Sequence, residues 1–188
     1  TIDGTAAAQA VTLFANAGNV TFTGGAGNDI VRLAPGNLNS LDVLEGGAGG
    51  FDLLQFDSNG TVSAAQLAST SGFEALKLVN GGNVTLNDGV ANGPLLTVAG
   101  GTAADTVDAS AETGTAVRFV GVGLNDSFTG GGLNDRFEMA SANFTLIDGD
   151  GGALNRMLPT VASFTFDLTA PANTPKLQNI QVIDLGFT

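Results

Sequence analysis

The residues of this chain best suited to chemistry are aspartates that close short glycine-rich stretches. The clearest stretch is GGAGNDIVR at 24–32, in which two glycines open a turn and Asp29 closes it. Carboxylates and backbone carbonyls are the oxygen ligands that Ca²⁺ takes in proteins, and glycine lets a carbonyl turn toward an ion without a steric penalty. The spacing therefore predicts a calcium site that involves Gly24, Gly25, Gly27 and Asp29.

A second copy of the pattern begins about 22 residues later, somewhat more than the roughly 18 residues expected between stacked neighbours. This stretch, GGAGGFDLL at 46–54, carries one extra residue before its aspartate. It adds Gly46, Gly47, Gly49 and Asp52 to the candidate metal-binding residues.

Three further aspartates occupy less regular copies. GGTAADTVD at 100–108 has an alanine in place of the third glycine and contributes Asp105. Residues 121–138 consist of two nearly identical nonapeptides, GVGLNDSFT and GGGLNDRFE. They contribute Asp126 and Asp135. These three aspartates complete the set of predicted calcium ligands.

The stretch at 24–32 matches the nonapeptide G-G-x-G-x-D-x-U-x at every fixed position. It thereby resembles the repeats-in-toxin (RTX) calcium-binding β-roll family, found in bacterial surface-layer proteins and large adhesins. The segments GFEALKL (72–78) and NIQVIDL (179–185) are also similar to strands of such proteins. The resemblance implies six-residue turns, three-residue strands, Ca²⁺ held between stacked turns, and export by a type I secretion route to the cell surface.

The spacing of the aspartates predicts which of them can share an ion. Consecutive nonapeptides lie on opposite edges of a roll, so Asp126 and Asp135 cannot be partners. The better pairs are Asp29 with Asp52 and Asp105 with Asp126, which need slightly longer turns than 18 residues. A purely structural alternative remains for 121–138, in which the Asn and Asp side chains hydrogen-bond their own turn backbone and no ion is required.

Composition narrows the function classes. The chain has 188 residues, with 18 acids against six bases and no Cys, His, Trp or Tyr. A net charge of −12 argues against binding nucleic acid, and the absence of His and Cys removes the commonest catalytic bases, nucleophiles and zinc ligands. We therefore expect no enzyme activity. No apolar run is long enough to span a bilayer, so no membrane insertion is expected. The first residues carry no basic segment, which predicts a processed product or an excised piece.

The elements that must position the aspartates are short strands. Apolar residues alternate in brief bursts separated by Gly, Asn and Asp, at 11–14, 20–22, 76–79, 84–86, 144–146, 164–168 and 180–185. SAAQLAS at 63–69 is the one candidate for a short helix or a helical turn. Together with the repeats, this pattern predicts an all-β, right-handed parallel β-solenoid or β-roll with irregular loops and at most one short helix. We expect a single elongated domain over 1–188 with a weak internal repeat (19–79, 83–140 and 143–188), and with Phe128 and Phe137 stacked inward.

The favoured function is an extracellular structural protein, part of a surface layer, adhesin or matrix fibre, that folds and self-assembles with calcium. The expected partners are calcium ions and other copies of the chain, with a cell-surface polysaccharide as a further candidate. Two alternatives are a C-terminal secretion and folding module of an exported RTX-type enzyme and a glycan-binding adhesin domain. An Asp/Glu pair for glycoside hydrolysis and an ice-binding threonine array are weaker hypotheses.

Overall fold

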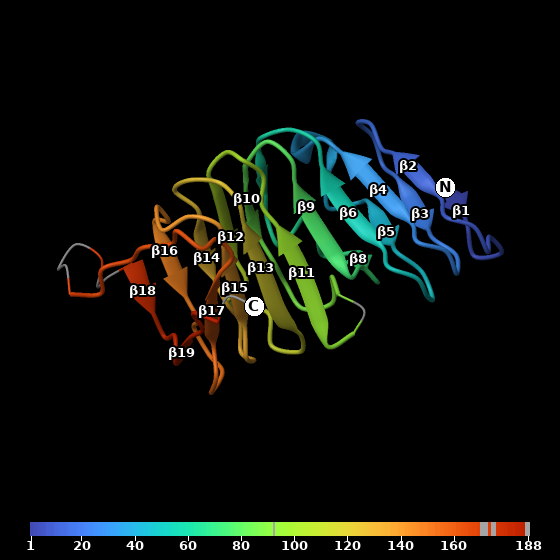
Figure 1. Cartoon of the computed structure of the whole chain (residues 1–188). Helices are drawn as coiled ribbons and strands as arrows, with labels where there is room; N and C mark the ends of the chain where they lie inside the picture. The colour runs from blue at the N-terminus through green and yellow to red at the C-terminus, as the bar shows by residue number, and fades with distance from the viewer. Residues whose placement is uncertain (92, 170–172, 174–175, 187–188) are drawn as a thin grey trace.

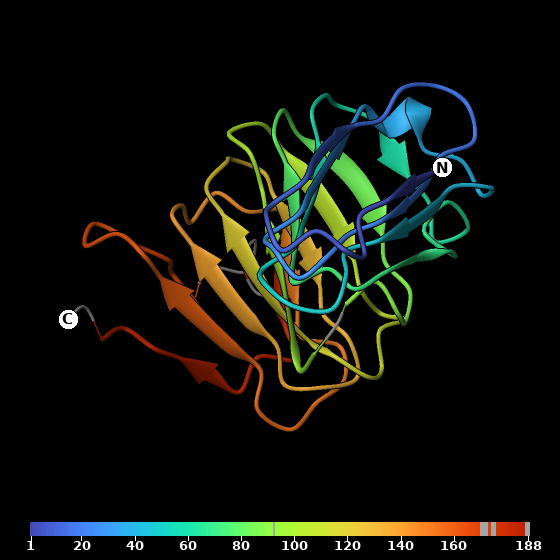
Figure 2. The same cartoon turned by 90° about the vertical axis from the view of Figure 1, so that its right-hand side faces the viewer.

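The chain winds into a parallel β-solenoid of about eight turns with almost no helix, which confirms the predicted fold class. The computed structural model describes residues 1–91, 93–169, 173 and 176–186. Figure 1 shows the coils stacked in chain order, with the N-terminal coil at one end and the C-terminal coils at the other. Seen from the N-terminal end, successive strands rotate relative to one another, so the stack twists as parallel sheets do (Figure 2).

One continuous nine-stranded sheet forms a single side of the coil. Its order along the stack follows the chain. The strands are β2 (Thr12–Phe14), β4 (Ile30–Leu33), β6 (Leu53–Phe56), β9 (Ala75–Leu78), β11 (Leu95–Ala99), β13 (Ala116–Gly121), β15 (Arg136–Met139), β17 (Arg156–Pro159) and β19 (Val182–Ile183).

The other side of the coil is divided between two sheets. A four-stranded sheet contains β1 (Ile2–Asp3), β3 (Thr21–Thr23), β5 (Val43–Glu45) and β8 (Thr70–Ser71). A six-stranded sheet contains β7 (Thr61–Val62), β10 (Gly82–Thr85), β12 (Asp105–Asp108), β14 (Ser127–Thr129), β16 (Leu146–Asp148) and β18 (Leu177–Gln178). The changeover falls between β6 and β9, where the chain begins the six-stranded sheet with β7 before it completes the four-stranded sheet with β8.

Residue spacing within the nine-stranded sheet gives the length of each coil. Phe119 pairs with Phe137 and Leu13 pairs with Val31, and each pair is separated by the 18 residues of two nonapeptides. Other coils are longer, up to the 26 residues between Met157 and Ile183. Strands keep their pairing while the connections absorb the extra residues, because lengthening a surface loop costs little.

The core is a ladder of alternating inward side chains between the two sides of the coil. Phe119, Phe128 and Phe137 are fully buried. The ring of Phe119 stacks on Phe137 in the neighbouring strand at 4.9 Å and on Phe128 from the opposite sheet at 5.1 Å. The doubled segment at 121–138 thus forms one strand on each side of the core, and both phenylalanines point inward as predicted.

One local prediction holds in part and one was wrong. Residues 64–69 form a run of turns rather than a helix, and the N–H of Leu67 donates to the Ser63 carbonyl as in a single helical turn. Gln66 accepts hydrogen bonds from the backbone and hydroxyl of Ser63, while the described 3₁₀ helix is η1 (Pro35–Asn37). Residues 164–168 form no strand. Phe164 and Phe166 instead pack against the core from an irregular segment, with Phe166 at 4.9 Å from the ring of Phe144.

Candidate functional site: carboxylates at the corners of the coil

Asp29 closes its glycine turn with both carboxylate oxygens. One oxygen accepts a hydrogen bond from the backbone N–H of Gly25 at 2.7 Å, within the same turn. The other accepts from the N–H of Val11 at 2.6 Å, in the preceding coil. The side chain is fully buried, so the aspartate satisfies two backbone donors that would otherwise be unpaired away from water. Asp29 therefore ties its own turn to its neighbour.

Asp135, which precedes β15, repeats the arrangement that Asp29 makes before β4, although its sequence context is less regular. Its two oxygens accept from the N–H groups of Gly131 at 2.6 Å and of Val117 at 2.7 Å. The residue is buried, with 1% of its surface exposed. The structural alternative derived from the sequence, in which Asp hydrogen-bonds the turn backbone, describes this corner.

Two runs of such corners lie along the edge that precedes the nine-stranded sheet. Within each run, a backbone N–H donates to a side-chain oxygen of the next coil. The first run ends at Glu74, whose N–H donates instead to the Asp52 carbonyl of the preceding coil. The N–H of Asp29 donates to Asp52 and the N–H of Asp52 to Glu74, both at 2.7 Å. Further along, the N–H of Asp135 donates to Asn155 and the N–H of Asn155 to Gln181, again at 2.7 Å. We call this series the corner ladder.

The opposite edge carries the second predicted pair. The N–H of Asp105 donates to Asp126 at 3.1 Å, so these aspartates lie in successive coils, as their spacing predicted. Asp126 precedes β14 and Asp135 precedes β15, which belong to different sheets. The neighbouring aspartates at 121–138 therefore do lie on opposite edges.

Three of the five predicted aspartates keep a buried oxygen without a hydrogen-bond partner: Asp52 Oδ2, Asp105 Oδ1 and Asp126 Oδ2. Asp29 accepts a hydrogen bond from the N–H of Gly25, four residues earlier. The Asp52 turn has one extra residue, so Asp52 lies one position further from the equivalent glycine. In the Asp126 turn, Val122 replaces the second glycine and no equivalent bond forms. An unpartnered buried oxygen is costly, which makes these three the residues open to a further ligand.

Burial and neighbouring carboxylates raise the pKa of several aspartates at these corners. Desolvation, together with the Glu74 and Asp29 carboxylates, raises the pKa of Asp52 to about 6. Desolvation, reinforced by the neighbouring Asp126 carboxylate, raises the pKa of Asp105 to about 7. Desolvation also raises the pKa of Asp126 and Asp135. The folded protein thus holds several carboxylates that resist ionisation.

The candidate glycines place carbonyls close to these carboxylates. A Cβ on Gly24 would lie 1.7 Å from the Gly46 carbonyl oxygen, so only glycine permits the two turns to stack this closely. A Cβ on Gly123 would lie 2.6 Å from the Ala103 carbonyl, 3.1 Å from the Gly101 carbonyl and 3.1 Å from Asp126 Oδ1. Oxygen atoms from two coils therefore converge above Gly123.

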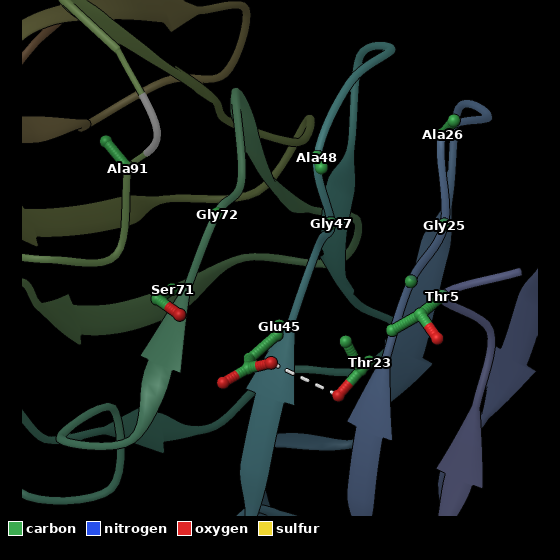
Figure 3. A pocket seen from close by; sticks show the side chains of 11 residues that line it. Thr5, Thr23, Gly25, Ala26, Glu45, Gly47, Ala48, Ser71, Gly72 and Ala91 are labelled. Carbon is green, nitrogen blue, oxygen red and sulfur yellow. Dashed lines mark hydrogen bonds between the residues drawn. The ribbon is translucent and has the colours of Figure 1, made fainter.

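The glycine turns of the N-terminal coils also line a surface groove of about 460 Å³. Figure 3 shows Gly25 and Gly47 at equivalent places in successive turns, with the hydroxyl of Thr23 donating to Glu45 at 3.1 Å. Gly24 lines the same groove, which places three of the predicted residues at its wall. Gly27 packs against the backbone of Gln9 and Ala10. Gly46 lies under the carbonyl of Gly72, and Gly49 lies near Ala26.

Sequence reasoning missed Glu112. Its side chain is 1% exposed and its Oε2 has no hydrogen-bond partner. Desolvation, with a contribution from the Asp88 carboxylate, raises the pKa of Glu112 to about 7. It lies in the connection between β12 and β13 outside any glycine-rich pattern, so the sequence held no signal for it. Glu74 and Asn155 were missed for a different reason, because each occupies an aspartate position of the corner ladder with another side chain.

The comparisons add no outside identification. No family model, curated protein or solved structure matches this chain. Among the described residues, no group of three or more His, Cys, Asp or Glu side chains is arranged to hold a metal ion. No helix in the described part of the chain is long and apolar enough to cross a membrane.

The corners nevertheless differ in how well they fit Ca²⁺. Asp29 and Asp135 already use both oxygens for backbone donors. Asp105 and Asp126 lie in adjacent coils, and each has a spare oxygen. Asp126 Oδ1 lies beside the carbonyls that converge above Gly123, and its spare Oδ2 lies beside Gly121. Ca²⁺ takes six to eight oxygens and tolerates irregular geometry, so carboxylates supplemented by carbonyls suit it.

Proposed function

We propose that this chain is a structural module of an extracellular protein, a surface-layer, adhesin or matrix-fibre component, whose coils are locked by calcium. The observation that supports the proposal is the set of spare, buried carboxylate oxygens at Asp52, Asp105 and Asp126. Asp105 and Asp126 would hold one ion with the carbonyls of Gly101 and Ala103. Asp52 would contribute to a second ion at the glycine turn of 46–52.

The energetics favour a cation at these corners. Ionised carboxylates buried without a counter-charge oppose folding, and the Asp105 and Asp126 carboxylates also repel each other. A divalent cation would reverse the sign of both effects. Because the ion binds the folded coil and not the unfolded chain, it would stabilise the fold in proportion to the logarithm of its concentration. A chain of this kind stays loose where calcium is scarce and stiffens where calcium is abundant.

Unfolding in the presence and absence of calcium tests the proposal. Far-ultraviolet circular dichroism is the readout, because the chain has no Trp or Tyr for fluorescence. We expect the urea midpoint to rise in millimolar calcium, to stay unchanged in equal magnesium, and to lose its calcium response in Asp126→Asn. A midpoint that is the same in calcium and in chelator would refute calcium locking and leave a metal-independent solenoid.

Two other functions would use the same architecture. The groove lined by Thr5, Thr23, Glu45 and Ser71 favours glycan binding as a second candidate, because hydroxyl and carboxylate groups from successive coils repeat along it. Binding of acidic or neutral polysaccharide that is lost in Glu45→Ala would favour this candidate. A secretion and folding module of an exported enzyme is distinguished by a catalytic domain elsewhere in the full reading frame.

A further inference from the structure

The positive charge of this acidic protein is concentrated on one surface. Five of its six basic residues project from the outer face of the nine-stranded sheet: Arg32, Lys77, Arg118, Arg136 and Arg156. Three acids accompany them there, namely Asp57, Glu138 and Asp184. We call this surface the basic face.

Three arginines form its centre. Arg118, Arg136 and Arg156 pair in register across β13, β15 and β17, so like charges stack on successive coils. Their side chains remain 38%, 50% and 43% exposed. Glu138 binds Arg118 at 2.6 Å and Arg136 at 2.7 Å. Arg156 has only a long contact of 3.5 Å with Asp184. The column is therefore incompletely neutralised.

The remaining fifteen acids share the rest of the molecule with Lys176 alone. Eight of them are at least partly exposed: Asp3, Glu45, Glu74, Asp88, Asp108, Asp148, Asp150 and Asp167. Asp108 and Asp148 lie in one outward column of the six-stranded sheet, on either side of Thr129. This sheet lies across the core from the nine-stranded sheet (Figure 1). We call its outer surface the acidic face.

The two faces also share a spacing. Each coil contributes one strand to each sheet over this region, so the three arginines repeat at the strand separation of about 4.8 Å. Asp108 and Asp148 lie two strands apart, at about twice that separation. The arginine column and the Asp108–Asp148 column are thus commensurate. Charge complementarity of this kind steers association and fixes its register.

Resting on the structural role proposed above, we propose that the basic face of one copy docks on the acidic face of a second copy. The contact joins two different surfaces of the same chain, so it leaves a free basic face at one side of the pair and a free acidic face at the other. A heterologous contact that does not close propagates into an open array. The occupant is a second copy because the chain itself supplies the complementary charge at the matching repeat.

Sedimentation velocity of the folded protein across a range of concentrations and salt tests this docking. We expect the weight-average sedimentation coefficient to rise with concentration at ~0.01 M salt and to stay monomeric near 1 M, where charges are screened. Lys77→Glu with Arg156→Glu should weaken association about tenfold or more, since like charges then meet. Lys176→Glu is the matched control, because it makes the same change of charge beside β18 of the six-stranded sheet, where added negative charge should not weaken the docking.

A charge-swap mixture gives the sharper test. Asp108→Lys with Asp148→Lys should also be monomeric alone, and mixing it with the Lys77→Glu, Arg156→Glu variant should restore association. Where Glu substitutions disturb the dichroism spectrum, Lys77→Ala with Arg156→Ala replaces them. Three results would overturn the proposal. The protein could stay monomeric at low salt, or Lys176→Glu could weaken association as much as the Lys77→Glu, Arg156→Glu variant does. Association could also require an added acidic polysaccharide such as polygalacturonate, in which case the basic face binds a glycan rather than a second copy.

The outcome is separable from that of the calcium proposal. Docking is read from sedimentation of protein whose fold is verified by dichroism, whereas calcium locking is read from the unfolding midpoint. A calcium-independent fold that still associates would therefore refute only the calcium proposal.

Discussion

Replacing Asp135 by alanine tests whether the corner aspartates stabilise the coil through the backbone. The substitution removes the acceptors of the Val117 and Gly131 N–H groups, which lie at 2.7 and 2.6 Å. Hydrogen bonds to a charged acceptor contribute about 1.5–3 kcal/mol each, and the donors left behind are buried. Desolvation of the carboxylate, which raises the pKa of Asp135, offsets part of this. We expect a net loss of about 2–4 kcal/mol, a large fraction of typical domain stability.

The assay is urea and thermal unfolding followed by far-ultraviolet dichroism, in calcium and in chelator. For a domain of this size, the expected loss lowers the melting temperature by roughly 5–15 °C. The loss should be the same in both conditions, because both oxygens of Asp135 serve backbone donors rather than an ion. Asp108→Ala is the control, since that carboxylate accepts from Ser110 at the surface. A loss confined to calcium, or no larger than in the control, would refute the reasoning.

Three further predictions concern charge and packing in the coil. In chelator, the free energy of unfolding should fall as the pH rises from about 4 to about 7. The pKa of Asp105 and of Glu112 is raised to about 7 in the folded protein, so the unfolded chain loses these protons at lower pH. Urea midpoints that do not change over this range would contradict the prediction. Asp105→Asn should raise the free energy of unfolding in chelator at pH 7 by about 1–3 kcal/mol and abolish the calcium response, since it removes the desolvated charge but keeps an acceptor for Gly101. Gly24→Ala should prevent native stacking, whereas Gly36→Ala, which meets nothing within 4 Å, should leave the melting temperature nearly unchanged.

Most of the fold could be predicted from the sequence, because the strands and turns of a solenoid recur at a regular spacing. The nine-residue spacing of Phe128 and Phe137 indicated the length of half a coil and the inward direction of both rings. The division of the side opposite the nine-stranded sheet into two sheets could not be predicted. The spacing of apolar residues indicates where strands lie in the sequence, but not which strands pair with one another. The strand predicted at 164–168 is absent because alternating apolar residues indicate which side chains are buried and not whether the backbone pairs with a neighbouring strand. Phe164 and Phe166 reach that burial from an irregular segment.

The candidate site was readable in position and less so in chemistry. Spacing predicted that Asp29 stacks with Asp52 and Asp105 with Asp126, and these contacts are present. Whether a carboxylate oxygen meets an N–H or stays spare depends on single insertions and substitutions, such as the extra residue before Asp52. Such details of register are set by the neighbouring coil and cannot be read from one turn alone. Asn155 illustrates this, because its amide donates to turn carbonyls where aspartate could not.

The hydrogen bonds of the corner ladder all run in one direction. At every described rung, the donor belongs to the earlier coil and the acceptor to the later one, from Val11 to Asp29 and from Asn155 to Gln181. Each coil of the ladder therefore depends on the coil that follows it for the acceptor of a corner N–H group. The stack is polar in this respect, since its two ends are not equivalent: Val11 at the N-terminal end takes part as a donor, and Gln181 at the C-terminal end takes part as an acceptor.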